Sequence, residues 1–227
     1  MSLTERYRRP ADLPARIPAF PLRGAILLPR ATLRLNVFEP RYLALVDDVL
    51  AGQRILGIIQ PGTIDGETGE SPVGKDFPLR RVGCAGRITS YEEVEAARLM
   101  ITITGIARFE VVDEALTAKP YRTLSVSYDR FAGDFTAGLG EERVDRDTLL
   151  RVLKAYLEAK SLQADWEAVT RSRSEALVNA LSVMSPYGSE EKQALLEAAD
   201  LKARADVLVA LAEMELATTG ESGGTLQ

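Results

Sequence analysis

Histidine is absent from the 227 residues of the chain, and cysteine occurs only once, as Cys84. Without histidine the chain cannot form a Ser-His or Cys-His catalytic pair, an imidazole general base or a metal site that needs imidazole. A single cysteine excludes an internal disulfide and a zinc site built from thiolates. Because Cys84 lies in an apolar stretch without a base partner, we expect a buried small residue and not a nucleophile.

Long apolar runs and an excess of positive charge are also missing. No run of 18 apolar residues is present, so the sequence predicts no membrane-spanning helix. Residues 1–16 contain arginines without the apolar segment of a secretory signal. The 33 acidic residues outnumber the 28 basic ones, which argues against nucleic acid as the main partner because phosphate binding needs a basic surface. We expect a cytoplasmic protein that does not associate with membranes.

The first half of the chain has the periodicity of β-strands. Leu33, Leu35 and Val37 alternate with polar residues and therefore share one face of a predicted strand. Glycines and prolines separate several such segments, which is typical of an antiparallel sheet or a small closed barrel. One helix interrupts them, because Pro40 suits a first helical position and Gly52 suits a helix end. Seven candidate segments are expected to form about six strands: 17–22, 32–37, 54–60, 82–91, 100–106, 108–112 and 124–128.

The second half has helical periodicity and most of the negative charge. Residues 1–140 carry 18 basic and 17 acidic residues, whereas residues 141–227 carry 10 and 16. Apolar stripes at helical spacing, with caps at Ser189 and Asp200, predict a small bundle of four helices with Trp166 in a helix core. The sequence therefore predicts an α+β fold. Its expected parts are a flexible basic arm at 1–14, a β-rich domain at 15–131, a linker at 132–140, a helical bundle at 141–219 and a disordered tail at 220–227.

No catalytic residue, cofactor or metal site is expected. Residues 69–76 match the spacing of a phosphate-binding loop up to Lys75, but Asp76 replaces the required Ser or Thr and Pro78 disfavours the helix that should follow. Lys160 and Ser161 are adjacent instead of spaced across a site, as a Ser-Lys catalytic pair would be. Three acidic clusters lack the pattern of a calcium loop and are interpreted as solvated charge: Asp47 and Asp48; Asp65, Glu67 and Glu70; and Glu92, Glu93 and Glu95.

An ordered set of short motifs resembles a known family. Phe20-Pro21-Leu22, Leu28-Pro29 and Phe38-Glu39-Pro40-Arg41-Tyr42 follow one another as in the N-terminal substrate-recognition domain of the Lon ATP-dependent proteases. The likeness continues through 82–88, 103–109, 119–121 and 191–197. It implies a barrel of the pseudouridine-synthase-associated (PUA-like) type followed by a helical bundle. It also implies a free-standing member without the ATPase and protease modules.

The signature residues Phe20, Pro21, Leu22, Phe38, Glu39, Pro40, Arg41 and Tyr42 are expected to set the fold more than to bind. We expect Phe38 and Tyr42 to plug the barrel where the strand turns into the helix. Glu39 and Arg41 are expected to fix that corner through ion pairs.

The resemblance implies a non-enzymatic module that binds polypeptide segments. On this hypothesis it engages unfolded or regulated proteins in quality control, beside a partner protease or chaperone. RNA binding is an alternative, favoured by PUA-like barrels and by arginines in the first thirty residues. A small hydrolase that uses carboxylates alone is a weaker one. The oligomeric state stays open.

Overall fold

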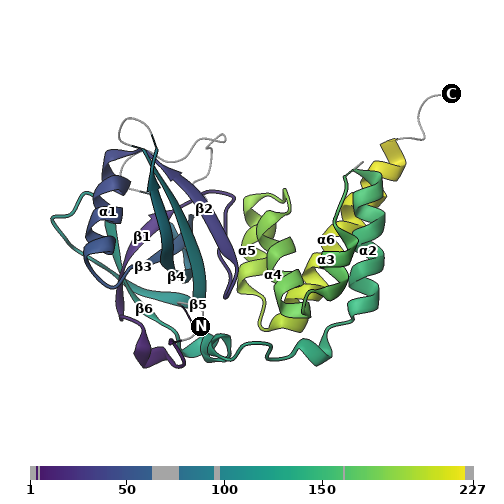
Figure 1. Ribbon diagram of the computed structural model, residues 1–227, viewed down its shortest axis with the longest axis horizontal. Coiled ribbons are helices and arrows are strands. Elements are labelled where there is room, and N and C mark those ends of the chain that lie inside the picture. Colours follow the sequence, from purple (N-terminus) through teal and green to yellow (C-terminus); the bar gives the residue numbers. More distant parts are fainter. Residues whose placement is uncertain (1–3, 5, 63–76, 95–97, 161, 223–227) are drawn as a thin grey trace.

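The computed structural model describes residue 4 and residues 6–62, 77–94, 98–160 and 162–222. It has an α+β fold in which a β-barrel with one helix precedes a group of helices in the chain (Figure 1). The barrel and the helical half lie side by side, and α5 (Ser189–Glu197) is the helix nearest the barrel in this view. Most of the Gly- and Pro-rich stretch 61–78 lies outside the described residues. None of the described helices is long and apolar enough to cross a membrane.

Six strands form one sheet in the order β2-β5-β4-β3-β1-β6, and a further pairing of β5 with β6 closes the barrel. The pairing of β1 with β3 is parallel, whereas the other pairings are antiparallel. The strands are β1 (Arg16–Pro21), β2 (Thr32–Val37), β3 (Ile55–Pro61), β4 (Leu79–Glu93), β5 (Leu99–Ala115) and β6 (Arg122–Ser127).

The long strand β5 makes closure possible, since its first half pairs with β2 and its second half with β6. The two strands expected at 100–106 and 108–112 are therefore one strand. Gly105 lies between these halves, where a Cβ atom would overlap the carbonyl oxygen of Leu28. The absence of a side chain lets the β1–β2 connection cross β5 at van der Waals distance.

Helix α1 (Pro40–Ala51) connects β2 to β3 and packs on the barrel. Pro40 is its first residue and Gly52 follows its last, as the sequence predicts. The buried face of α1 consists of Tyr42, Leu45, Val46 and Val49.

Five helices, one more than expected, follow the barrel in the described part of the chain. They are α2 (Arg146–Ala159), α3 (Trp166–Arg171), α4 (Ser174–Met184), α5 (Ser189–Glu197) and α6 (Leu201–Ser222). The additional helix, α3, has only six residues and no apolar stripe to reveal it. Trp166 begins α3 and is 38% exposed, so it does not lie in the core. The cap predicted at Asp200 is present, because its carboxylate accepts from the N–H of Ala203 at 2.9 Å. Ser189 instead occupies the first turn of α5, after an N-cap at Gly188.

One apolar core runs through both halves, since the same cluster contains barrel residues such as Ile103 and helix residues such as Leu195. Buried polar contacts add to it at the boundary. The Nε2 of Gln60 donates to the carbonyl of Ser189 at 2.8 Å, and the Nδ2 of Asn179 donates to the carbonyl of Pro29 at 3.0 Å. The helical half is therefore fixed against the barrel by apolar and directional contacts together.

The chain near the expected arm and linker is more ordered than the sequence suggested. A 3₁₀ turn, η1 (Pro10–Asp12), lies in the N-terminal segment, and Tyr7 and Leu13 are buried in a second core cluster of the barrel. A second 3₁₀ segment, η2 (Asp129–Phe135), carries the buried Asp134. Two isolated aromatic or aliphatic side chains in an arginine-rich stretch give no periodic signal, so their burial is a tertiary property.

Candidate functional site

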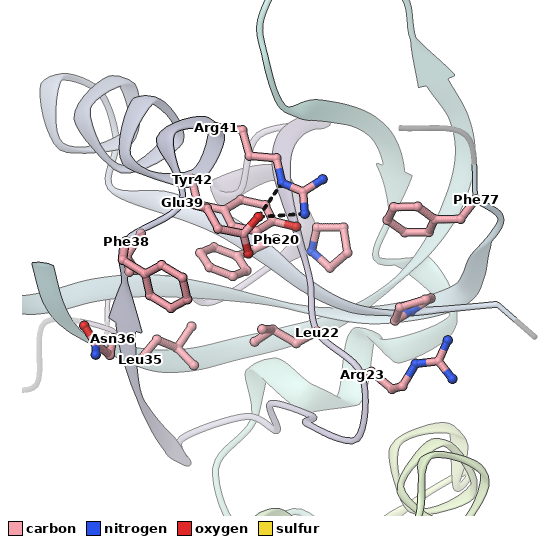
Figure 2. A pocket seen from close by; sticks show the side chains of 13 residues that line it. Phe20, Leu22, Arg23, Leu35, Asn36, Phe38, Glu39, Arg41, Tyr42 and Phe77 are labelled. Atoms are coloured by element: carbon pink, nitrogen blue, oxygen red, sulfur yellow. Dashed lines mark hydrogen bonds and ion pairs between the residues drawn. The ribbon is translucent and has the colours of Figure 1, made fainter. Parts of the chain in front are cut away.

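Seven of the eight signature residues, all except Pro40, line a hollow of about 130 Å³ at the corner where β2 meets α1 (Figure 2). One wall is the end of β1 with Leu22, and the opposite wall is the end of β2. Leu22 and Leu35 point into the hollow from these two sides. Its lining is Phe20, Pro21, Leu22, Arg23, Leu35, Asn36, Val37, Phe38, Glu39, Arg41, Tyr42, Pro61 and Phe77.

A stacked aromatic pair forms the base of this signature hollow. The rings of Phe20 and Tyr42 lie with centroids 4.2 Å apart at an interplanar angle of 16°. Both side chains are buried, and burial raises the pKa of the Tyr42 phenol. The stack joins the end of β1 to the first turn of α1.

Glu39 and Arg41 form an ion pair with each other. The Nε and Nη2 atoms of Arg41 lie 2.9 and 2.8 Å from one carboxylate oxygen of Glu39. The guanidinium carbon lies 4.5 Å from the centroid of the Tyr42 ring. The pair therefore covers the aromatic base from the helix side and gives the rim of the hollow both signs of charge.

Phe38 does not plug the barrel, contrary to the expectation from its spacing. Its side chain is 59% exposed, because Phe38 follows the last strand residue and precedes the helix that Pro40 begins. Alternation in β2 directs Val37 inward, so the next side chain is directed outward. The signature thus divides into buried residues that build the corner and one aromatic ring that lies open beside the hollow.

Phe77 and Pro61 complete the hollow from the far side. Phe77 is buried against Arg122, whose guanidinium carbon lies 5.3 Å from the ring centroid and whose Nη1 donates to the Phe77 carbonyl at 2.6 Å. The sequence analysis did not select either residue. They flank a Gly- and Pro-rich segment without periodicity, so no sequence pattern relates them to Phe20 or Tyr42.

The remaining candidates do not form a reactive site in the described part of the chain. Cys84 is fully buried, as expected, and burial raises the pKa of its thiol. Asp48 accepts hydrogen bonds from the Tyr121 hydroxyl at 2.6 Å and from Lys119 at 2.9 Å, and these bonds hold the pKa of its carboxyl below the usual value. Lys160 pairs with Glu215 at 3.0 Å.

No group of three or more metal-ligating side chains occurs among the described residues. The phosphate-loop-like segment 69–76, Ser161 and the acidic cluster Asp65, Glu67 and Glu70 lie outside those residues.

Comparison with known proteins identifies the family. The model of the ATP-dependent protease La (Lon) substrate-binding domain matches residues 16–213. The chain belongs to this family. A Lon protease of Flavobacterium johnsoniae is 26% identical over 200 residues, which cover 86% of this chain and 23% of that protein. Lon protease 2 of Myxococcus xanthus is 27% identical over 206 residues, covering 88% and 24%. The chain thus spans about a quarter of the length of these Lon relatives.

Solved structures of Lon N-terminal domains share the fold. The N-terminal domain of the Mycobacterium avium complex Lon protease has a TM-score of 0.62 at 16% identity, covering 87% of this chain and 98% of that one. The Lon N-terminal domain protein from Xanthomonas campestris has a TM-score of 0.59 at 21% identity, covering 86% and 97%. The family and the α+β fold expected from the signature motifs are therefore confirmed.

Proposed function

We propose that this Lon substrate-binding domain is a non-catalytic module that binds polypeptide segments, unfolded ones included, and that the signature hollow is part of its binding surface. The observation that carries the proposal is the open, partly apolar hollow beside an exposed aromatic ring. Exposed aromatic side chains next to a pocket are typical anchors of protein interfaces. The family description as a substrate-binding domain supports the same class of ligand.

The size of the hollow supports recognition of single apolar side chains. A protein cavity of about 150 Å³ lined by apolar residues holds one benzene molecule, so the hollow of about 130 Å³ suits a leucine, methionine or phenylalanine side chain. Such side chains are buried in folded proteins and become accessible when a chain unfolds. In this proposal the chain itself is non-catalytic, and any cleavage of the bound polypeptide belongs to a partner protease.

Fluorescence anisotropy tests the proposal directly. The probe is a fluorescein-labelled protein that has been reduced and carboxymethylated so that it stays unfolded, titrated with this protein at physiological salt. We expect saturable binding that other unfolded chains compete away and RNA does not. Phe38→Ala should weaken binding at least fivefold without unfolding the domain.

Met214→Ala provides a matched control, because Met214 is also an exposed apolar side chain, at 66%, and lies on α6 outside the hollow. Its affinity should stay within twofold of the wild type. Flat anisotropy for the wild-type protein would refute polypeptide binding. Saturable binding that Phe38→Ala leaves unchanged would refute the assignment to the signature hollow.

A further inference from the structure

Strand β2 has one free edge. Among the strands that the structure describes, β2 is the one that has a single neighbour along its whole length, because it pairs only with β5. Residues 22–31 return from β1 to β2, but no backbone hydrogen bond between described residues joins them to Thr32–Val37. An unpaired strand edge presents N–H and C=O groups that another chain can pair with. The signature hollow lies at the end of this same strand.

The register shows which backbone groups face the free edge. The N–H of Val94 donates to the carbonyl of Arg98 at 2.9 Å at the end of the β4–β5 ladder. Along an antiparallel strand, the backbone groups of every second residue bond to the same neighbouring strand. Arg98 bonds to β4, so the backbone groups of Met100 also bond to β4 and those of Ile101 bond to β2. Ile101 is opposite Leu35.

A second hydrogen bond agrees with this assignment of alternate residues, since the N–H of Gly105, four residues after Ile101, donates to the carbonyl of Ala31 at 2.9 Å. Leu33, Leu35 and Val37 therefore direct their backbone N–H and C=O groups to β5. Thr32, Arg34 and Asn36 direct theirs to the free edge.

Natural edge strands are protected by proline, by bulges or by several charges, and β2 has little of this protection. Its sequence is Thr-Leu-Arg-Leu-Asn-Val, with no proline and one charge. The side chain of Arg34 is exposed, and no ion pair joins it to another described residue. Arg34 therefore offers an unneutralised positive charge on the outer face of the edge, while Leu33 and Leu35 offer apolar surface on the inner face.

We propose that an extended segment of another polypeptide adds to the free edge of β2 as an antiparallel strand, with an acidic residue opposite Arg34 and apolar residues on either side of it. This inference rests on the function proposed above and specifies how the polypeptide is held. Antiparallel addition continues the arrangement of β2, β5 and β4, and antiparallel pairs are slightly more stable per residue than parallel ones. Apolar side chains of the added strand point inward, beside Leu35 and into the signature hollow.

Charge disfavours a second copy of β2 as the occupant. In the antiparallel register centred on Arg34, which pairs residues 32–36 of two β2 strands, the two Arg34 side chains are directly opposite each other. Like charges in that position are destabilising, whereas an aspartate or glutamate there is favourable. The edge of β2 therefore favours a segment of a different protein that combines an acidic residue with apolar residues.

Amide hydrogen exchange measured by NMR tests the mode of binding. The probe is an acetylated heptapeptide that alternates leucine with aspartate or threonine. At saturation, the amides of Arg34 and Asn36 should gain at least tenfold protection, because peptide carbonyls replace water as their acceptors. The amide of Leu35 should change less than twofold, since it already bonds to β5.

A matched pair of N-methylated peptides supplies an independent readout without altering the protein. Methyl groups on the aspartate and threonine amides remove donors that face β2, so the affinity should fall at least tenfold. Methyl groups on the leucine amides face away from β2 and should weaken binding less than threefold. Asn36→Pro, which removes an edge donor but no bond to β5, should also weaken binding at least tenfold.

The outcomes separate this inference from the proposed function. Peptide binding without new protection at Arg34 and Asn36, or equal affinity of the two methylated peptides, would overturn strand addition while polypeptide binding stands. Failure of both the heptapeptide and the unfolded protein to bind would overturn both. Protection of Arg34 and Asn36 that rises with protein concentration in the absence of peptide would assign the edge to a second copy and overturn the inference.

Discussion

Replacing Asp134 with alanine is expected to destabilise the protein by about 3–5 kcal/mol, because the substitution leaves a buried arginine without its carboxylate. Asp134 lies in η2 and faces Arg108 on β5. The Nε and Nη2 atoms of Arg108 each donate to one of its carboxylate oxygens at 2.8 Å, and the backbone N–H of Arg108 donates at 2.9 Å. Asp134 is thus the only carboxylate within ion-pair distance of Arg108 in the described part of the chain.

The magnitude follows from the burial of this pair. Side-chain exposure is 4% for Arg108 and 10% for Asp134, so solvent cannot replace the lost contacts. After Asp134→Ala, the guanidinium keeps only the carbonyls of Leu196 and Ala198, at 3.1 and 2.5 Å, and the Phe131 ring at 4.2 Å. Breaking a buried ion pair on one side is strongly destabilising for this reason.

Urea denaturation followed by circular dichroism measures the effect. Glu110→Ala is the matched control, because it removes the carboxylate of the exposed Arg130–Glu110 pair at 2.8 Å and should change the unfolding free energy by less than about 1 kcal/mol. The double variant Arg108→Met with Asp134→Leu should be closer to the wild type than Asp134→Ala, since no buried charge remains. A loss below about 1 kcal/mol for Asp134→Ala would refute the reasoning.

Three further predictions follow from the barrel and the helical half. Phe20→Ala should lower the unfolding free energy by about 3–5 kcal/mol, because a buried, stacked ring is removed. Phe38→Ala should change the unfolding free energy by less than about 0.5 kcal/mol, because its ring is exposed. Equal losses for the two variants in urea denaturation would contradict these different roles. Gly105→Ala should destabilise the protein by about 1–3 kcal/mol, because the new methyl group meets the backbone of Leu28. Gly133→Ala meets only the tip of the Leu139 side chain and should change thermal stability little. Similar melting temperatures for the two variants would contradict the close approach of Leu28 to Gly105. Burial lowers the pKa of Lys192 to about 8, against 10.5 in the unfolded chain. Between these two pH values the unfolded chain binds more protons than the folded protein, so the unfolding free energy should rise with pH. Denaturation at pH 7.5 and 9.5 should show this rise in the wild type relative to Lys192→Met, and a stability difference between the two proteins that falls or stays constant would exclude this effect of Lys192.

The sequence predicted the parts of the fold that local physics controls. Period-two alternation of apolar residues identified β2, and Pro40 and Gly52 marked the two ends of α1. The change to helical spacing identified most of the helices in the second half of the chain. The motif from Phe38 to Tyr42 marked the corner where β2 turns into α1. These successes share a cause, because each depends on residues close together in the chain.

The errors at this corner and in the helical half have the opposite cause. Phe38 and Tyr42 are similar side chains four residues apart, yet one is open to solvent and the other is buried, because β2 ends and α1 begins between them. The two segments predicted around Gly105 are one strand since only its pairing partners, β2 and β6, change there. The short helix α3 has too few residues for a periodic pattern.

By itself, the sequence determined the alternation of apolar residues, the helix ends, the lack of imidazole chemistry and the motifs that indicate the Lon family, because these depend on residue type and spacing. Only the tertiary structure decided which residues meet. Strand pairing left β2 with a free edge, brought Phe77 to the hollow formed by Phe20 and Leu35, and buried Asp134 against Arg108. Those contacts join residues far apart in the chain, and they depend on the closure of the barrel and its packing against the helices.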